Sequence, residues 1–267
     1  ASANVFNLDL KPFIHSGNQN LSISLLPEGL GTADDAMPED LSAEEYREFW
    51  HNIGIKTVSV MTNDAASAGL QTILISLYLP TSNPDVVFND AFLDAFLGGF
   101  VDGCRQVGCV YFSGETPQLK TKIIENRVDI AGAIFAISPA GMAPVDSSRL
   151  RAGDHIVFVA SSGPHENGFT TLRNIASELP GGYRTKLSDG TQYWQAINAG
   201  SVLYTPLVQE LVSSGVKLTG IENITGHGWQ KIRRSSGSFR YRITKMLPVL
   251  PVFSFLNESY GLAWDQM

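Results

Sequence analysis

The chain has 267 residues and a mass of 29.0 kDa, which suits two domains of ordinary size or one large α/β domain, since a typical domain takes roughly 100–200 residues. We expect two domains. Hydrophobic residues make up 43% of it and charged residues 17%, a composition that excludes a disordered chain. The formal net charge is −7, from 19 Lys and Arg against 26 Asp and Glu. Binding to a phosphate backbone needs excess basic charge, so this balance argues against nucleic acid as a partner.

The sequence shows neither a membrane segment nor a leader. No apolar run reaches the roughly 18–20 residues that a membrane-spanning helix requires, and residues 1–20 lack a basic segment followed by an apolar stretch. We therefore expect a cytoplasmic protein with no membrane partner. Cys104 and Cys109 are the only two cysteines, with no second pair to complete a metal site, so we expect buried, reduced thiols.

The first half of the chain alternates segments of strand and helix character. Residues 21–26 predict a strand that runs into a turn with two glycines, residues 27–32. Ser42 is a predicted N-cap of a helix that ends near Asp64. Further strands are predicted at 71–79, 109–112 and 127–138, and a further helix at 85–107.

The stretch 139–153 has two prolines, a pair of arginines and no clear period, which is typical of a domain boundary. We assign residues 1–140 to an N-terminal domain and residues 141–267 to a C-terminal domain. In the second domain, apolar runs predict strands and helical spacing predicts helices. The predicted strands are 155–160, 217–224 and 239–244, and the predicted helices are 169–179, 203–214 and 252–258. The pattern indicates an α/β layer.

Four acids lie where strands or helices end, or inside an apolar strand: Glu28, Asp64, Glu115 and Asp129. A buried carboxylate costs several kcal/mol unless it is neutralised, so four such acids suggest a shared cation. Oxygen ligands of this kind suit Mg²⁺, which also bridges to nucleotide phosphates. Taken singly, each acid is more often a helix cap, a turn former or half of a salt bridge.

Two Gly-rich turns follow predicted strands in the second domain. Residues 161–168 (SSGPHENG) precede a predicted helix, and their glycines let the backbone N–H groups approach an anion such as a phosphate. His165 could add a donor there or act as a solvated or capping residue. Residues 223–229 (NITGHGW) form the other turn, which a plain strand-to-helix connection with Trp229 in the core also explains.

Taken in order, these segments resemble the aminoimidazole ribonucleotide (AIR) synthase family. The family's Asp-Gly-x-Gly-Thr-Lys is similar to residues 28–33, its Asn-Asp to residues 63–64, and its Gly-Gly-Glu-Thr to residues 113–116. Its Asp-x-Ala-Gly, Ser-Ser-Gly-x-His-x-Asn-Gly and Thr-Gly-Gly-Gly resemble residues 129–132, 161–168 and 225–228. The resemblance runs from about Leu21 over nearly the whole chain.

The resemblance implies an α/β fold. In it, strands of the N-terminal domain form a barrel with those of a second subunit, and a C-terminal α/β layer domain follows. It implies an ATP-dependent cyclo-ligase of purine biosynthesis, which closes the imidazole ring of formylglycinamidine ribonucleotide to give aminoimidazole ribonucleotide, ADP and phosphate. The implied cofactors are ATP and Mg²⁺, the implied partner is a ribonucleotide substrate, and the implied assembly is a homodimer.

The same resemblance supplies site residues but no catalytic residue. It implies an ATP site at Glu28, Gly29, Gly31, Thr32, Asn63, Asp64, Gly114, Glu115 and Thr116. It implies a substrate phosphate site at Ser161, Ser162, Gly163, His165, Asn167, Gly168, Thr225, Gly226 and His227. The implied metal ligands are Glu28, Asp64, Glu115 and Asp129.

The chain departs from the family pattern at four places. Ala33 stands where the family has Lys, Glu28 replaces Asp, and Asn223 stands where AIR synthases often carry His. Residues 265–267 resemble the start of a further family segment, so we expect the C-terminal domain to be incomplete relative to the family. Two alternatives therefore stay open. One is a related ATP-dependent phosphotransferase on another substrate, and the other is a non-catalytic nucleotide- or phosphate-binding subunit of the same fold.

Overall fold

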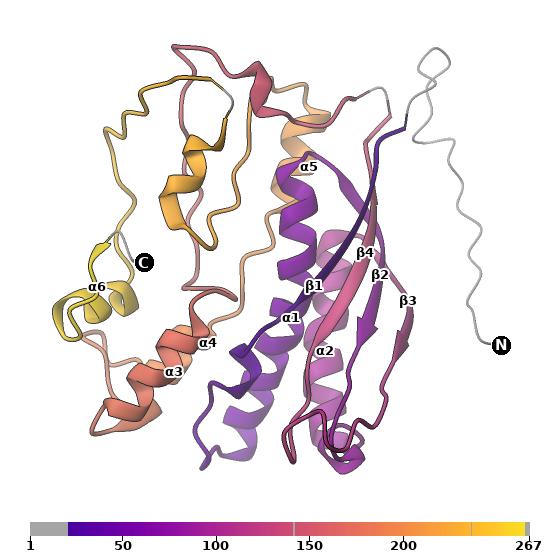
Figure 1. Ribbon diagram of the computed structural model, residues 1–267, viewed down its shortest axis with the longest axis vertical. Helices are drawn as coiled ribbons and strands as arrows, with labels where there is room; N and C mark the ends of the chain where they lie inside the picture. The colour runs from indigo at the N-terminus through magenta and orange to yellow at the C-terminus, as the bar shows by residue number, and fades with distance from the viewer. Residues whose placement is uncertain (1–20, 141, 236, 265–267) are drawn as a thin grey trace.

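The computed structural model describes residues 21–140, 142–235 and 237–264. The expectations that concern residues 1–20 and 265–267 lie outside this part of the chain. The N-terminal half contains a four-stranded mixed sheet with two long helices, and the C-terminal half contains short helices joined by loops (Figure 1).

The sheet is built from four strands in the order β1-β4-β2-β3. Their bounds are β1 (Ile23–Gly29), β2 (Gln71–Tyr78), β3 (Val110–Glu115) and β4 (Ala131–Ile137). β4 pairs antiparallel with both β1 and β2, while β2 and β3 are parallel. All four predicted strands are therefore present, although β4 starts later than predicted. Val128 joins the sheet only through an isolated bridge to Thr81.

The sheet brings together the strand ends that carry the predicted site motifs. β1, β2 and β3 end at the same edge of the sheet, and β4 begins there, because Ala131 pairs with both Gly29 and Tyr78, and Tyr78 pairs with Glu115. The turn after β1, the Gly-Glu-Thr segment and the approach to β4 therefore share one edge.

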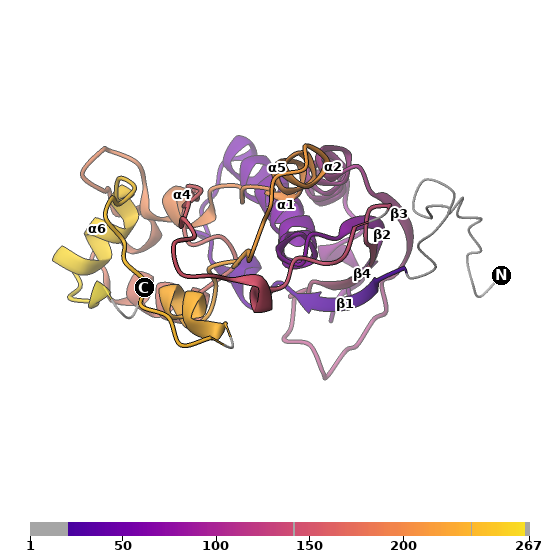
Figure 2. The same ribbon diagram turned by 90° about the horizontal axis from the view of Figure 1, so that it is seen from above.

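Helices α1 (Ala43–Ser67) and α2 (Asp90–Val107) cover one face of the sheet (Figure 2). Ser42 caps α1 as predicted, because its hydroxyl accepts from the Glu45 N–H while the Glu45 carboxylate accepts from the Ser42 N–H. The helix runs past Asp64 to Ser67 before Gly69 takes a left-handed conformation at φ +71°.

The two helices pack against each other through aromatic rings and glycines. Trp50 of α1 lies 4.7 Å from Phe92 of α2, ring centroid to ring centroid, and both rings are buried. A Cβ on Gly99 would lie 1.9 Å from the His51 carbonyl oxygen, and one on Gly54 would lie 2.2 Å from that of Phe96. The backbones can approach this closely only because these residues lack side chains.

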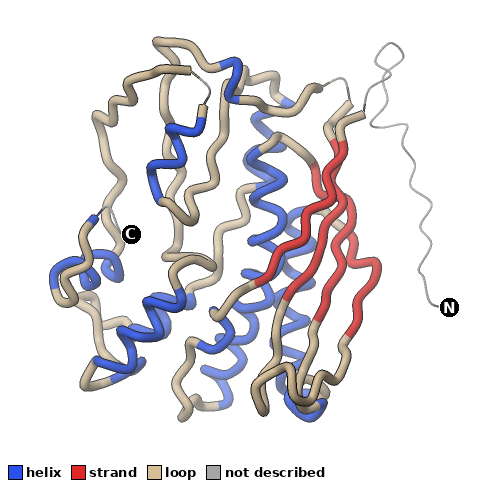
Figure 3. The backbone as a smooth tube through the Cα atoms, in the orientation of Figure 1, coloured by secondary structure: helices blue, strands red, loops and turns tan. Residues whose placement is uncertain are grey.

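In the described C-terminal half, all the regular secondary structure consists of helices (Figure 3). Its α-helices are α3 (Phe169–Glu178), α4 (Tyr193–Asn198), α5 (Thr205–Ser213) and α6 (Pro251–Glu258). The predicted helices 169–179, 203–214 and 252–258 are confirmed as α3, α5 and α6.

The three strands predicted in this half are wrong for the described residues, since 155–160, 217–224 and 239–244 form no strand. A strand needs a neighbouring strand to pair with, and within the described residues none of these segments pairs with one. Their apolar side chains consequently remain in solvent, with Val157 81% exposed and Val159 52% exposed. An α/β layer is therefore absent from the described C-terminal half.

Cys104 and Cys109 are both buried and free, as the sequence predicts. Within the described residues, no helix is both long enough and apolar enough to cross a membrane.

Candidate functional site

The turn after β1 begins the site. Its backbone is fixed by a 2.8 Å hydrogen bond from the Leu30 N–H to the Ile130 carbonyl, which ties it to the approach to β4. Gly31 takes a left-handed conformation with φ +70°, which is why a glycine suits this position. Ala33 follows in a short 3-10 turn and is fully buried. No cation is therefore presented from position 33, where the family pattern has Lys.

Glu28 of β1 and Asp64 of α1 lie close enough for their charges to interact. Glu28 lies on the face of β1 that alternates with the exposed side chains Ile23 and Leu25, so it points towards the helices. Burial raises the pKa of Glu28, and the neighbouring Asp64 carboxylate raises it further. The structure thus brings together two of the four acids predicted to hold a metal ion.

A segment of the C-terminal half, residues 223–231, contacts Asp64. The Asn223 side-chain amide donates to Asp64 Oδ1 at 2.7 Å. Lys231 Nζ in turn donates to the Asn223 carbonyl oxygen at 3.0 Å and to the Thr225 hydroxyl. Burial lowers the pKa of Lys231, and the Asp64 carboxylate opposes that effect. Lys231 is a functional candidate that the motif comparison missed, whereas Asn223 was noted only as a departure from the family pattern.

The other two predicted metal ligands lie apart from this pair. Glu115 ends β3, three strands from β1, which corresponds to roughly 14 Å at about 4.8 Å per strand. Asp129 lies before β4, close enough to Asp34 to affect its pKa. Among the described residues, no three His, Cys, Asp or Glu side chains lie where they could hold a metal ion together. The four acids do not converge within this chain, and their metal-binding role stays a prediction.

Asp34 is a buried carboxyl group that sequence reasoning did not single out. Burial raises its pKa to about 8, and the adjacent Asp35 carboxylate adds to this. Asp35 itself pairs with Arg127 at 3.3 Å and Arg173 at 3.4 Å. In the sequence, the only feature that could have pointed to Asp34 was the pair of acids directly after Gly-Thr-Ala.

Residues of the predicted ATP site also have structural tasks. Asn63 donates to the Val202 carbonyl oxygen at 2.9 Å and accepts from the Tyr204 N–H at 2.9 Å. A Cβ on Gly114 would lie 2.6 Å from the Leu77 carbonyl oxygen, so this glycine is required by the contact between β2 and β3. Both residues are held by the fold, and their part in ATP binding stays a prediction.

The loop 161–168 is docked onto α1 through a buried lysine. Lys56 is fully buried in α1, and its ammonium donates to the His165 carbonyl oxygen at 2.5 Å. It also lies 5.4 Å from the centroid of the Phe169 ring. Burial lowers the pKa of Lys56 to about 8, although the Glu166 carboxylate opposes that effect. A lysine inside an otherwise apolar helix stretch was the sequence signal for this contact.

His165 and Glu166 add further contacts between the loop 161–168 and α1. We call this set of contacts, centred on Lys56, the joint. His165 Nε2 accepts from the N–H groups of Ser162 and Val202, each at 3.3 Å. Glu166 accepts from the hydroxyl groups of Ser59, on α1, and Ser201, the latter at 2.5 Å. His165 and Glu166 thus make internal contacts.

The other predicted phosphate ligands fall into two groups. In the loop 161–168, Ser162 donates to the Gly200 carbonyl oxygen at 2.6 Å, and Gly168 is the left-handed N-cap of α3 at φ +75°. The remaining loop residues are Ser161, Gly163 and Asn167. The turn of Thr225, Gly226 and His227 lies next to Asp64 through Asn223 and Lys231. Whether either group binds phosphate stays a prediction.

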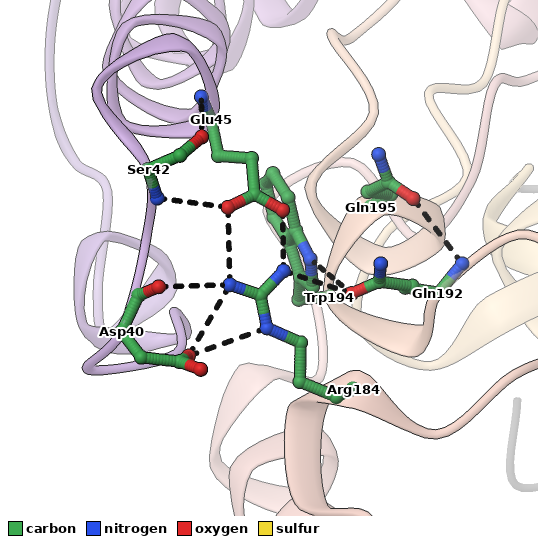
Figure 4. A network of polar contacts seen from close by, with 7 residues as sticks. All are labelled: Asp40, Ser42, Glu45, Arg184, Gln192, Trp194 and Gln195. Atoms are coloured by element: carbon green, nitrogen blue, oxygen red, sulfur yellow. Dashed lines mark hydrogen bonds and ion pairs between the residues drawn. The ribbon is translucent and has the colours of Figure 1, made fainter.

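A second polar network joins the C-terminal half to the start of α1 (Figure 4). Arg184 donates two hydrogen bonds to the Glu45 carboxylate, one of them at 3.0 Å, and another at 3.2 Å to Asp40. Arg184 also donates to Gln192 at 3.0 Å. The Arg184 guanidinium lowers the pKa of Glu45 to about 2. The capping residue Glu45 therefore also anchors the second half of the chain.

Residues 32–137 match the family model described as "AIR synthase related protein, N-terminal domain". This stretch belongs to the AIR synthase related family. It contains Asp64, the Gly-Glu-Thr segment and Asp129, and it starts within the turn that follows Glu28. The resemblance inferred from ordered motifs is confirmed.

The relatives of this chain include two phosphoribosylformylglycinamidine cyclo-ligases from Synechococcus. The protein from Synechococcus sp. (strain CC9902) is 30% identical over 211 residues, covering 76% of this chain and 59% of that protein. The one from strain CC9605 is 32% identical over 179 residues, covering 67% and 50%. The matches thus span about half to three fifths of the length of these relatives.

Among solved structures, thiamine-monophosphate kinase from Stenotrophomonas maltophilia K279a is 18% identical with a TM-score of 0.47. The match covers 74% of this chain and 55% of that one.

Because His165 is buried in this joint, we expect the free energy of unfolding to fall in mild acid. Burial and the Lys56 ammonium lower the pKa of His165 from 6.5 to about 4, so the unfolded chain binds more protons between these values. Lowering the pH from 7 to 5 should therefore remove about 2 kcal/mol of the free energy of unfolding through this residue. Urea unfolding at both pH values measures the loss.

The matched variant for this measurement is His165→Asn, because Asn tolerates the left-handed backbone that His165 adopts at φ +53°. It should lose about 2 kcal/mol less than the unmodified chain over the same pH interval. An equal loss in both proteins would show that His165 does not titrate as the buried joint requires.

Proposed function

We propose that this chain carries out ATP-dependent ring closure, converting formylglycinamidine ribonucleotide to aminoimidazole ribonucleotide with release of ADP and phosphate. The observation that carries the proposal is its 30% identity over 211 residues to a phosphoribosylformylglycinamidine cyclo-ligase. As a step of purine biosynthesis, the reaction would place the protein in the cytoplasm.

The residues around Asp64 fit a metal-bound nucleotide by their donor chemistry. Mg²⁺ is usually held by one or two carboxylates together with substrate phosphates, and Glu28 and Asp64 are two carboxylates whose charges interact. Their mutual repulsion, which contributes to the raised pKa of Glu28, would be relieved by a divalent cation. We propose that these two acids hold the metal ion.

Bound Mg²⁺ and ATP supply the phosphoryl group and the charge neutralisation for activating the formyl oxygen of the substrate. The chain's own residues then have mainly positioning tasks. Asn223 fixes one oxygen of Asp64 through its 2.7 Å hydrogen bond, which leaves the other oxygen for a cation. In this proposal, the turn 225–227 and the loop 161–168 approach the substrate's phosphate through backbone N–H groups.

One observation favours a non-catalytic subunit as a second candidate. Position 33 is a buried alanine, so the lysine that follows Gly-Thr in the family pattern has no counterpart there. A protein of this kind would bind nucleotide or phosphate without turning it over.

The proposed activity is tested with Asp64→Asn, a variant that preserves shape and removes the charge. We expect ATP binding to weaken at least about tenfold in the presence of Mg²⁺ and to change little in its absence. Titration calorimetry gives both affinities, and ADP release on adding formylglycinamidine ribonucleotide gives the activity.

Asp94→Asn is the matched control, since Asp94 is exposed on α2. Equal losses of ATP affinity with and without Mg²⁺ would contradict a metal role for Asp64. Nucleotide binding without ADP release would favour the non-catalytic subunit.

We further propose that the chain forms a homodimer through the open face of its sheet. The helices cover one face (Figure 2), while Leu25 on the opposite face of β1 is 73% exposed and Ile23 is 59% exposed. Light scattering should give about 58 kDa, twice the 29.0 kDa of one chain. Leu25→Lys should shift this towards the monomer, whereas Leu207→Lys on α5 should not. A wild-type mass near 29.0 kDa would remove the dimer.

A further inference from the structure

A cavity of about 240 Å³ lies beside Asp64, between the N-terminal half and the segment 222–234. Its walls include Ser24 of β1, Asp64 and Ser67 of α1, and Lys231 and Arg234 of the C-terminal half. Both halves of the chain therefore contribute polar groups to a single cavity.

The two cations reach this cavity because of local helix geometry. Residues Gly228–Arg234 form a 3-10 helix, η6, which has three residues per turn. Side chains three positions apart lie on the same face of such a helix, which explains why Lys231 and Arg234 both line the cavity. Arg233 and Arg234 are both exposed, and only Arg234 lines the cavity.

Both cations retain donors for a ligand. Lys231 uses its ammonium for the Asn223 carbonyl and the Thr225 hydroxyl, and an ammonium has three donors. Within residues 21–140, 142–235 and 237–264, the Arg234 guanidinium makes no hydrogen bond or close ion pair, although Glu222 is near enough to feel its charge. A guanidinium with free donors is well suited to a phosphate group.

The size of the cavity limits what it can take. Pockets that enclose drug-sized ligands measure roughly 300–1,000 Å³. The cavity of about 240 Å³ is smaller, so it suits one or two phosphate groups and not a whole nucleotide. The Asp64 and Glu222 carboxylates in its wall would repel a free anion, which favours a phosphate that arrives with a divalent cation.

We propose that this cavity binds a phosphate group, and that Lys231 and Arg234 are the side chains that contact it. The proposal rests on the proposed function in so far as the phosphate comes from ATP or from a ribonucleotide substrate. Cationic charge is then delivered by η6, from Lys231 and Arg234.

Arg234→Gln tests the proposal with Arg233→Gln as the matched control, because both remove one charge from the same short helix. Lys231→Gln is less suitable, since Lys231 also holds the 223–225 turn. Titration calorimetry with Mg²⁺ present measures the binding of pyrophosphate, ATP and ribose 5-phosphate. We expect Arg234→Gln to weaken pyrophosphate binding about tenfold or more, and Arg233→Gln to change it less than about twofold.

The two organic probes identify the source of the phosphate. A loss confined to ATP assigns the cavity to the nucleotide, and a loss confined to ribose 5-phosphate assigns it to the substrate. Equal effects of Arg234→Gln and Arg233→Gln, or no binding of any probe by the unmodified chain, would overturn the proposal.

The experiments distinguish an error in the phosphate-binding proposal from an error in the proposed ring-closing activity. Ring closure by the unmodified chain, with equal effects of the two variants, would overturn the cavity alone. A selective loss of pyrophosphate in Arg234→Gln, with no ADP release by the unmodified chain, would support the cavity and contradict the proposed activity.

Discussion

The buried ammonium of Lys56 is the constraint on which the arrangement of the two halves depends. It lies inside α1, and the His165 carbonyl at 2.5 Å is its hydrogen-bond partner. An unpaired buried charge is costly, so the loop that supplies this carbonyl must stay against the helix. Glu166 reinforces the contact through Ser59 and Ser201. α1 thereby joins the sheet on one side to the C-terminal half on the other.

This joint has a consequence for the site. Asp64 lies two turns after Lys56 on the same helix, and it meets Asn223 and Lys231 from the C-terminal half. The cavity beside Asp64 exists only while both halves hold their positions on α1. Contacts at Lys56 and at Arg184 therefore set the geometry of a site to which neither Arg184 nor Lys56 contributes a wall.

Periodicity and turn chemistry predicted the N-terminal half well, because α1, α2 and the strands are set by local patterns such as the Ser42 cap. They failed for 155–160 and 217–224, since a strand depends on a partner that a local pattern cannot reveal. Ordered motifs singled out Asp64 and the turn 225–227, which the structure places near each other. They missed Lys231 and Arg234, whose position follows from η6 and the docking of distant segments.

The most direct test of this account is a double-mutant cycle on Lys56→Met and Glu166→Gln, with Lys217→Met as an exposed control and urea unfolding as the readout. Lys56→Met should lower the free energy of unfolding by about 1–3 kcal/mol, because the buried His165 carbonyl loses its donor. The double variant should cost at least about 0.5 kcal/mol less than the sum of the single variants. Additive losses, or a Lys56→Met protein as stable as the control, would contradict the central role of this joint.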